Sequence, residues 1–422
     1  MSSLNMLDNT IQSTAVRLPW GAWYEDTTHR LPLPRAWQVD RLEPADAPAW
    51  ERERIAAALA APIASPPLAE LARTCHTASI VVDDLARPTE TADVLPTLIE
   101  QLENAGLGRS AITVLVATGT HGPLTSEQIE RKLGPDVAKA VRVEVHDART
   151  STVPTEIRYG QQRLRINRTF LESELKLSVG SVLPHSFAGY SGGAKLLLPG
   201  LADVKATARS HKFVEMGLRG GADPNENRFR LEIERLAREL GLGYTVCMVP
   251  NSRRETAGVF AGDLVAAHRE ACRTAARVYA TPLRETYDCV VLNAYPKDVD
   301  LVQAENALVA LKTARAPVVH GEGILVIATA ASEGLGRHGL FAPGGHSYRT
   351  PRRKRALGGR ELWLYAPGIT EEEARQLHWE GYPFFHDAAA LCEALGERFP
   401  GAARAAVLPC APVQQIDDRR TA

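Results

Sequence analysis

Short apolar runs rich in β-branched residues alternate with longer amphipathic stretches along this chain of 422 residues. The short runs predict strands over 79–83, 112–118, 141–146, 175–179, 244–249, 289–293, 324–328 and 362–365. The longer stretches predict helices over 94–106, 126–133, 225–240, 264–279, 303–314 and 371–377. Thr125, with Gln128 three residues later, is typical of a capping box at the start of the second helix. Alternation of this kind predicts an α/β protein with largely parallel sheets flanked by helices.

The length of the chain favours two domains, because a single core stops growing well below this size. We expect an N-terminal α/β domain over residues 1–280 and a C-terminal α/β domain over 281–402, since a helix ends and a new strand begins at this boundary. The sequence leaves open whether the tail, residues 403–422, returns to the first domain. Ligands of open α/β sheets bind at the carboxyl ends of the strands, so we expect an active site in the cleft between the domains.

Composition and charge exclude some classes of partner. Apolar residues make up 45% of the chain and charged residues 23%, and the net charge is −1, so no global field favours nucleic acid or a membrane surface. We expect the short basic run at 349–355 to be a solvated loop rather than a nucleic-acid patch. The start of the chain lacks a signal-peptide pattern and the apolar runs are too short to span a bilayer, so a cytoplasmic protein is expected. The six cysteines form no CxxC pair and are expected to be buried apolar residues.

The segment 184–200 and the histidine that follows it carry the most chemistry. His185, Lys195 and His211 place two imidazoles and one amine within 27 residues, and glycines between them allow close approach of the backbone to a ligand. The two histidines are too far apart in sequence for a metal pair on one helix, so their roles depend on the fold.

Lys195 does not belong to a phosphate-binding loop, because that motif requires Gly before the lysine and Ser or Thr after it. Ala194 and Leu196 stand at these positions. Beside an apolar stretch, a lysine can lose its proton by desolvation and become a nucleophile. Considered alone, a lysine beside glycines is more often an ordinary surface residue.

Two further polar loops follow predicted strands. Arg87 offers a planar fork for a carboxylate or phosphate, and Asp84 could hold either that arginine or a ribose hydroxyl. The alternative is an ordinary salt bridge at the strand end. His121 lies between polar residues and glycines after the next strand, where it suits general acid/base catalysis or serves as a structural loop histidine.

A last polar cluster opens the predicted helix over 303–314. Gln303 and Asn306 are one helical turn apart, so both side chains can face one pocket. The alternative is an ordinary helix N-terminus capped by Asp298 or Asp300. The loop over 332–336, SEGLG, follows another strand and is weak evidence by itself.

Together, these motifs resemble those of the lactate racemase family, enzymes built on a nickel-pincer nucleotide. They are DDLARPT (83–89), ATGTHG (117–122), PHSFAGYSGGAK (184–195) with LPG (198–200), ARSH (208–211) and DLVQ (300–303). The resemblance runs from residues 31–34 to about residue 336.

The resemblance implies a cofactor, pyridinium-3,5-bisthiocarboxylic acid mononucleotide nickel, covalently linked to Lys195. It implies His211 as the protein ligand of nickel, a role that suits a neutral imidazole. It further implies cofactor-biosynthesis enzymes as partners. The residues expected beside the cofactor are Asp84, Thr118, Gly192 and Gly193.

For catalysis, the resemblance implies a racemase or epimerase of a small 2-hydroxy acid. His121 and His185 would be the two general acid/bases, one for each face of the substrate. Arg87 would bind the substrate carboxylate with help from Gln303. One histidine would take the hydroxyl proton while the C2 hydrogen leaves as hydride, and return of the hydride to the other face would invert C2.

This chain departs from the family pattern at Asn306, where a lactate racemase has a substrate-binding lysine, and at Val302, where an aromatic residue would stand. Loss of a charge-assisted hydrogen bond costs about 1.5–3 kcal/mol, so we expect lactate to be a poor substrate, with Asn306 pairing with a neutral group such as an extra hydroxyl. Two other functions remain open: a metal-independent racemase that abstracts the C2 proton, and a non-catalytic nucleotide-binding protein.

Overall fold

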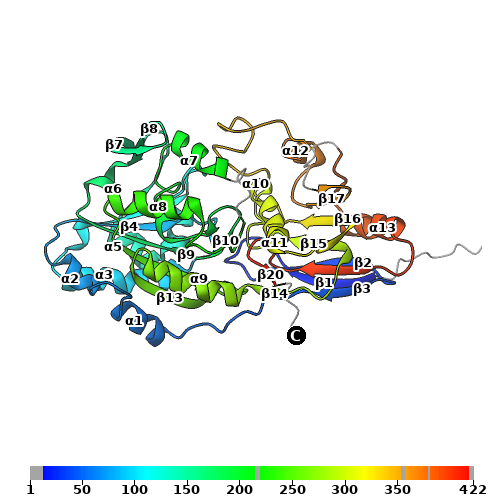
Figure 1. The fold of residues 1–422 in the computed structure, drawn as a ribbon, viewed down its shortest axis with the longest axis horizontal. Coiled ribbons are helices and arrows are strands. Elements are labelled where there is room, and N and C mark those ends of the chain that lie inside the picture. Colours follow the sequence, from blue (N-terminus) through cyan, green and yellow to red (C-terminus); the bar gives the residue numbers. More distant parts are fainter. Residues whose placement is uncertain (1–12, 214–218, 353–356, 379–380, 418–422) are drawn as a thin grey trace, which may run out of the picture.

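The computed structural model describes residues 13–213, 219–352, 357–378 and 381–417. The chain forms two halves, each built on a six-stranded sheet with helices around it (Figure 1). The expected α/β fold with largely parallel sheets is confirmed. Within the described residues, no helix is both long and apolar enough to cross a membrane.

The first sheet has the strand order β13-β12-β9-β4-β5-β6, and only β13 runs antiparallel to its neighbour. Its strands are β4 (Ala78–Asp83), β5 (Ile112–Ala117), β6 (Arg142–Val145), β9 (Leu175–Ser181), β12 (Tyr244–Pro250) and β13 (Thr256–Asp263). The helices of this half are α1 (Arg52–Ala60), α2 (Leu68–Ala72), α3 (Leu95–Asn104), α4 (Ser126–Leu133), α5 (Pro135–Ala140), α6 (Arg168–Glu172), α7 (Val204–His211), α8 (Arg228–Glu239) and α9 (Ala266–Val278).

The second sheet has the order β18-β17-β16-β15-β19-β3, and all its strands are parallel. Its strands are β3 (Gln38–Arg41), β15 (Tyr287–Asn293), β16 (Val319–Ala328), β17 (Glu361–Tyr365), β18 (Phe384–Phe385) and β19 (Arg404–Leu408). The helices of this half are α10 (Leu301–Ala304), α11 (Val309–Thr313), α12 (Glu371–Ala374) and α13 (Ala388–Arg398).

Short two-stranded pairs complete the fold. They are β1 (Ser13–Pro19) with β2 (Thr28–Pro34), β7 (Thr152–Tyr159) with β8 (Gln162–Asn167), β10 (Pro184–His185) with β11 (Gly189–Tyr190), and β14 (Ala280–Pro282) with β20 (Gln415–Asp417). Short 3-10 turns are η1 (Thr91–Asp93), η2 (Arg109–Ala111), η3 (Gly193–Leu196) and η5 (Glu305–Leu308). The last of these turns matters for the site because it carries Asn306.

Each predicted strand corresponds to a strand of the two sheets. The predicted capping box is present: the Thr125 hydroxyl accepts from the Gln128 amide N–H, and the Gln128 side chain accepts from the Thr125 N–H. The helix predicted over 303–314 is instead divided into α10, η5 and α11, and it begins at Leu301 because the Asp300 carboxylate caps it.

The strand pairing does not follow a division of the chain at residue 280. β3, from the N-terminal part, pairs with β19 in the second sheet, and β20 in the tail pairs with β14. With four residues and no fully buried position, β3 lacks the apolar run that reveals a strand in sequence. Part of the basic run, residues 353–355, lies outside the described residues, as do residues 1–12 and 418–422.

The first sheet is buried on both faces, which explains the continuous apolar character of β4. Ile80 and Val82 pack into one core beneath helices α1 to α3. Val81 points to the other core, which also contains Leu197 and Leu198. The apolar stretch after Lys195 is therefore anchored in a core, and this fixes the position of the lysine.

Candidate active site

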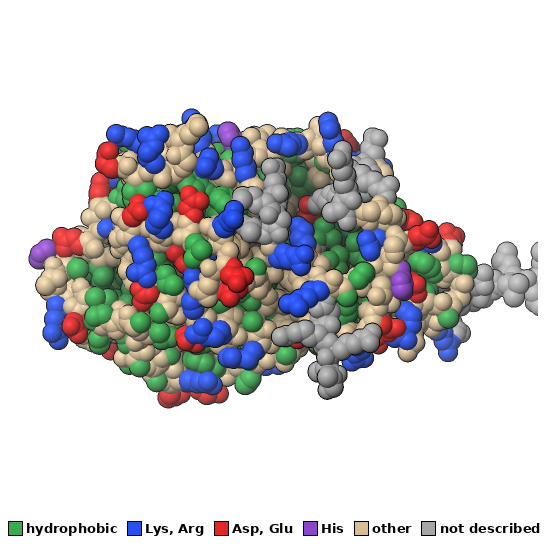
Figure 2. All heavy atoms as spheres, in the orientation of Figure 1, with side chains coloured by type: hydrophobic (Ala, Val, Ile, Leu, Met, Phe, Trp, Pro, Cys, Tyr) green, Lys and Arg blue, Asp and Glu red, His purple; other side chains and the backbone are tan. Residues whose placement is uncertain are grey.

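A cavity of about 550 Å³ lies between the two halves, where β4, β5 and β9 end on one side and β15 and β16 on the other. The face drawn in Figure 2 is hollowed between the halves, and Lys and Arg side chains gather along its middle. Most of the residues singled out from the sequence line the cavity: Asp84, Arg87, Thr118, His121, His185, Gly192, Lys195, His211, Gln303 and Asn306. Gly193, the next residue after Gly192, is buried at the start of η3.

His121 follows β5, and Asp84 follows the neighbouring strand β4. The Asp84 carboxylate accepts a hydrogen bond from Nδ1 of His121. Burial would raise the pKa of Asp84, but the neighbouring His121 and Arg87 outweigh it and lower this pKa to about 2. Asp84 is therefore ionised and accepts, which leaves Nε2 of His121 to exchange a proton with a ligand.

Gln303 reaches the same histidine from the other half, and Asn306 holds Gln303 in place. The Nδ2 amide of Asn306 donates to the Oε1 atom of Gln303 at 3.1 Å and to its carbonyl oxygen at 2.8 Å. This fixes the Gln303 amide so that its Nε2 lies 3.4 Å from Nε2 of His121. The expectation that both side chains face one pocket is confirmed.

His185 lies on β10, which follows the end of β9, and its side chain lines the cavity. Burial, and then the charges of Lys195 and Lys297, lower the pKa of His185 well below its usual value. Its Nδ1 accepts a hydrogen bond from the N–H of Ala188 at 3.4 Å. His185 is therefore a neutral imidazole whose proton is on Nε2. It can accept a second proton at Nδ1, or it can accept one at Nε2 after that nitrogen has given up its own.

Lys195 lies on η3, where it is half-buried and lines the cavity. Burial, and then the charges of Arg87 and Arg230, lower the pKa of its amine well below the usual value. A neutral amine is the nucleophilic form of lysine. The sequence prediction that this lysine can lose its proton by desolvation therefore agrees with its surroundings.

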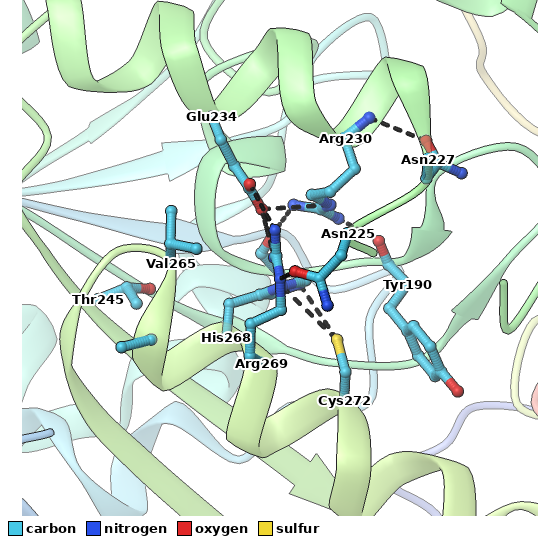
Figure 3. A network of polar contacts seen from close by, with 12 residues as sticks. Tyr190, Asn225, Asn227, Arg230, Glu234, Thr245, Val265, His268, Arg269 and Cys272 are labelled. Atoms are coloured by element: carbon cyan, nitrogen blue, oxygen red, sulfur yellow. Dashed lines mark hydrogen bonds and ion pairs between the residues drawn. The ribbon is translucent and has the colours of Figure 1, made fainter. Parts of the chain in front are cut away.

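A buried polar network supports the turn that precedes Lys195 (Figure 3). The Arg230 guanidinium donates to the carbonyl of Gly192 at 3.1 Å and to the carbonyl of Tyr190. Nε2 of His268 donates to the carbonyl of Ser191 at 2.9 Å. Three successive carbonyl groups are thus held from behind, which fixes the turn in one conformation.

Glu234 neutralises the arginines of this network. Its carboxylate makes two hydrogen bonds with Arg269, of 2.7 and 2.8 Å, and lies 3.9 Å from Nε of Arg230. All three side chains are buried, and Asn225 accepts a further hydrogen bond from Arg269 at 2.8 Å. Removal of one member would leave a buried charge without its partner.

His211 ends α7, a helix that Asp203 caps at its start. Its Nδ1 lies 2.8 Å from the carbonyl of Thr207 and therefore donates to it. Burial lowers the pKa of His211 to about 4, so the imidazole is neutral, and its Nε2 has no hydrogen-bond partner among the described residues. This is the usual arrangement of a metal-binding histidine, whose second nitrogen donates to a carbonyl group.

Arg87 lines the cavity and its charge favours an anionic ligand. Nη1 of Arg87 donates to the neighbouring carbonyl of Ala86 at 3.2 Å, and the described residues show no ion pair between Arg87 and Asp84. Arg87 and Asp84 therefore do not form the salt bridge considered for the strand end, where Asp83 instead pairs with Lys132 at 2.7 Å. Lys297 is buried, and burial followed by the charge of Arg87 lowers its pKa well below the usual value.

The remaining predicted residues shape the wall of the cavity. Thr118 donates from its hydroxyl to the carbonyl of His146 at 2.6 Å. Gly192 has a φ of +77°, and a Cβ there would lie 2.9 Å from Val182, so the turn requires glycine.

These residues fit a lysine-linked nickel nucleotide. A buried neutral amine and a neutral histidine with one free nitrogen are the donors that such a group needs from the protein. No group of three or more His, Cys, Asp or Glu side chains in the described residues is placed to hold a metal by itself. A nucleotide that brings its own sulfur and carbon donors requires only the histidine.

Sequence reasoning did not assign several residues of this region. His338 and Phe341, from the loop after β16, line the cavity, although the loop has no periodic pattern. Lys297 precedes Asp298 and Asp300, the residues of this stretch that the sequence offers as helix caps. Arg230 and Glu234 are four residues apart on α8, a spacing typical of an ordinary surface pair.

Comparison with known proteins gives consistent matches. The model of the lactate racemase N-terminal domain matches residues 24–219. Lactate racemase of Lactiplantibacillus plantarum is 29% identical over 298 residues, which cover 69% of each chain. Lactate racemase of Thermoanaerobacterium thermosaccharolyticum is 26% identical over 302 residues, covering 69% of this chain and 68% of the relative.

Solved structures share the fold. The lactate racemase apoprotein of Thermoanaerobacterium thermosaccharolyticum superposes with a TM-score of 0.76 at 20% identity, over 96% of this chain and 100% of that one. A crystal structure of a Thermotoga maritima protein gives a TM-score of 0.63 at 16% identity, over 89% of this chain and 100% of that one. The chain thus carries a lactate racemase N-terminal domain over residues 24–219 and is similar to lactate racemases over 69% of its length, and these matches indicate an enzyme of the racemase class. The solved structures show that it shares their fold.

Proposed function

We propose that this enzyme inverts C2 of a 2-hydroxy acid by reversible hydride transfer, with a lysine-linked nickel-pincer nucleotide as cofactor. The observation that carries the proposal is the convergence on one cavity of two histidines, a neutral lysine and a third histidine with one free nitrogen. Lys195 would hold the nucleotide and His211 its nickel. When bound, this group supplies a reversible acceptor for the C2 hydride.

The protein side of the reaction is proton exchange and positioning. His121, oriented by Asp84, removes the hydroxyl proton of one enantiomer through Nε2. His185 is the second acid/base, and its Nε2–H is the proton given to the C2 oxygen when the hydride returns to the other face. Arg87 binds the carboxylate. The Gln303 amide, which faces His121 in this structure, donates its hydrogen bond to the substrate instead. Enzymes that load the cofactor are expected partners.

We further propose that lactate is a poor substrate. The Asn306 amide is engaged with Gln303 and carries no charge, so a three-carbon acid gains no ion pair there. An acid with a further hydroxyl group beyond C2 would form hydrogen bonds with the side-chain amides of Gln303 and Asn306. This favours a longer, hydroxylated 2-hydroxy acid.

A panel of 2-hydroxy acids tests the proposal, with the protein co-expressed with cofactor-assembly enzymes and with its nickel content and intact mass measured first. We expect racemisation of at least one acid that is faster than that of lactate. For that acid, deuterium at C2 should be retained in ordinary water. Washout of deuterium would indicate proton abstraction at C2, and binding of nucleotide without any turnover would indicate a non-catalytic protein.

A further inference from the structure

The loop that follows β16 brings another histidine, His338, into the cavity from the second half. The N–H of Gly339 donates to the carbonyl of Thr120 at 2.6 Å, and His121 and His338 form an isolated antiparallel bridge. A Cβ on Gly339 would lie 3.0 Å from that carbonyl oxygen, so this approach depends on glycine. The backbones of the two loops are therefore in direct contact across the cleft.

The ring of His338 packs among the residues assigned to catalysis. Its centroid lies 5.0 Å from that of His121, edge to face, and 5.0 Å from that of Phe341. Phe341 in turn lies 5.3 Å from His211. His338 and Phe341 thus form a chain of packed rings that leads from the acid/base histidine to the histidine that would bind nickel.

The hydrogen bonds of His338 determine its tautomer. Its Nδ1 accepts from the N–H of Leu340 at 3.1 Å and faces the N–H of Phe341 at 3.4 Å. A neutral imidazole carries one proton, which must then be on Nε2. Burial, followed by the charge of His121, lowers the pKa of His338 to about 2, so it stays neutral. No hydrogen-bond partner of Nε2 is found in the described part of the chain, and this donor is left for a ligand.

We propose that His338 is a further catalytic residue, whose Nε2–H donates a hydrogen bond to the C2 oxygen of the substrate. This inference rests on the proposed racemase function. As Nε2 of His121 takes the hydroxyl proton, negative charge develops on that oxygen, and a fixed neutral donor stabilises it. The proton of His338 remains on its own nitrogen throughout, so His338 orients and stabilises while His121 exchanges the proton.

Two variants separate donation from packing. His338→Phe keeps a ring against His121 and Phe341 but lacks the N–H, and we expect kcat to fall about 100-fold, as for loss of one donor to a developing oxyanion. His338→Gln restores a neutral N–H donor and should recover a large part of this loss, with an unchanged pH profile. Equal activity of His338→Phe and the wild type, or better activity of His338→Phe than of His338→Gln, would overturn the assignment.

A second measurement does not depend on turnover. 2-Hydroxy-2-methylpropanoate has no hydrogen on C2, so it can bind but cannot react. On titration into the cofactor-loaded wild-type protein, the ¹⁵N signal of His338 Nε2 should shift while Nδ1 keeps its acceptor character. A bound probe that leaves this signal unmoved overturns the assignment. If no 2-hydroxy acid is turned over, the proposed function fails, and this titration still decides whether His338 contacts such an acid.

Discussion

Nδ1 of His121 donates a hydrogen bond to the carboxylate of Asp84. The contact joins the ends of two adjacent parallel strands, β4 and β5, and it gives His121 one tautomer with Nε2 as the reactive nitrogen. Asp84 was expected beside the cofactor, and its contact with His121 adds a positioning role. Because Asp84 is held in its ionised form, it also stabilises the imidazolium that forms when His121 takes a proton.

Asp84→Asn is therefore expected to lower kcat by about 10²- to 10⁴-fold, because an amide can hold the wrong tautomer and cannot stabilise the imidazolium. KM should change less, since Arg87 still binds the carboxylate. Steady-state kinetics on protein with wild-type nickel content and intact mass provide the measurement. An unchanged kcat would show that Asp84 has no part in the acid/base chemistry.

His211→Ala should remove nickel without removing the nucleotide. The free Nε2 of His211 is the one protein donor assigned to the metal, whereas Lys195 holds the organic part. We expect the metal-to-protein ratio of the loaded enzyme to fall severalfold, by elemental analysis, while the mass of the lysine adduct persists. His320→Ala, an exposed histidine outside the cavity, is the matched control. Full retention of nickel by His211→Ala would exclude it as the ligand.

The sequence was sufficient to predict that polar loops at the ends of parallel strands meet at one site. Strand-end residues such as Asp84 and His121 meet because parallel strands place their carboxyl ends at one edge of the sheet. From the apolar stretch after Lys195, the sequence also predicted that this lysine can lose its proton by desolvation, and burial does lower its pKa.

Other parts of the site depend on tertiary contacts that no local pattern records. Helix α7, which carries His211, has few apolar residues and was not predicted. His338 is placed by a glycine that fits against Thr120 in the other half of the molecule. β3 is a strand because it pairs with β19, and the paired residues Gln38 and Arg404 are more than 360 positions apart in the chain.

Asn306→Lys should improve the use of lactate. A lysine there restores the charge that a lactate racemase has, and a charge-assisted hydrogen bond corresponds to about 10- to 150-fold in kcat/KM for a substrate with one carboxylate. Asn306→Met is the control, because it removes the amide that holds Gln303 without adding charge. Its kcat/KM for lactate should fall below that of the wild type. If the Lys and Met variants behaved alike, Asn306 would not determine the substrate.

Glu234→Gln tests the network behind the lysine turn. The change leaves the buried guanidinium groups of Arg269 and Arg230 without their counter-charge, which costs about 3–5 kcal/mol in the free energy of unfolding. Glu239→Gln, on the same helix, breaks an exposed pair with Arg235 and should cost about 1 kcal/mol or less. Urea denaturation of both variants gives the comparison. Equal losses would mean that burial of the network adds nothing to stability.

Asp298→Asn tests the pH dependence of stability. Burial raises the pKa of Asp298 to about 7, from an ordinary value of 3.8, and its Oδ1 has no hydrogen-bond partner among the described residues. Between these two pH values the unfolded chain ionises and the folded protein does not, so the stability that this carboxyl provides at low pH is lost as the pH rises through about 7.

The asparagine variant keeps an acceptor for the N–H of Gly21, which Oδ2 of Asp298 binds at 2.8 Å, and it has no proton to lose. Its Tm relative to the wild type should therefore rise steadily between pH 4 and pH 7 and then level off. Asp136→Asn, at an exposed position, should show no such trend in the same thermal scans. A Tm difference that does not vary with pH would show that Asp298 ionises at the same pH in the folded and unfolded chain.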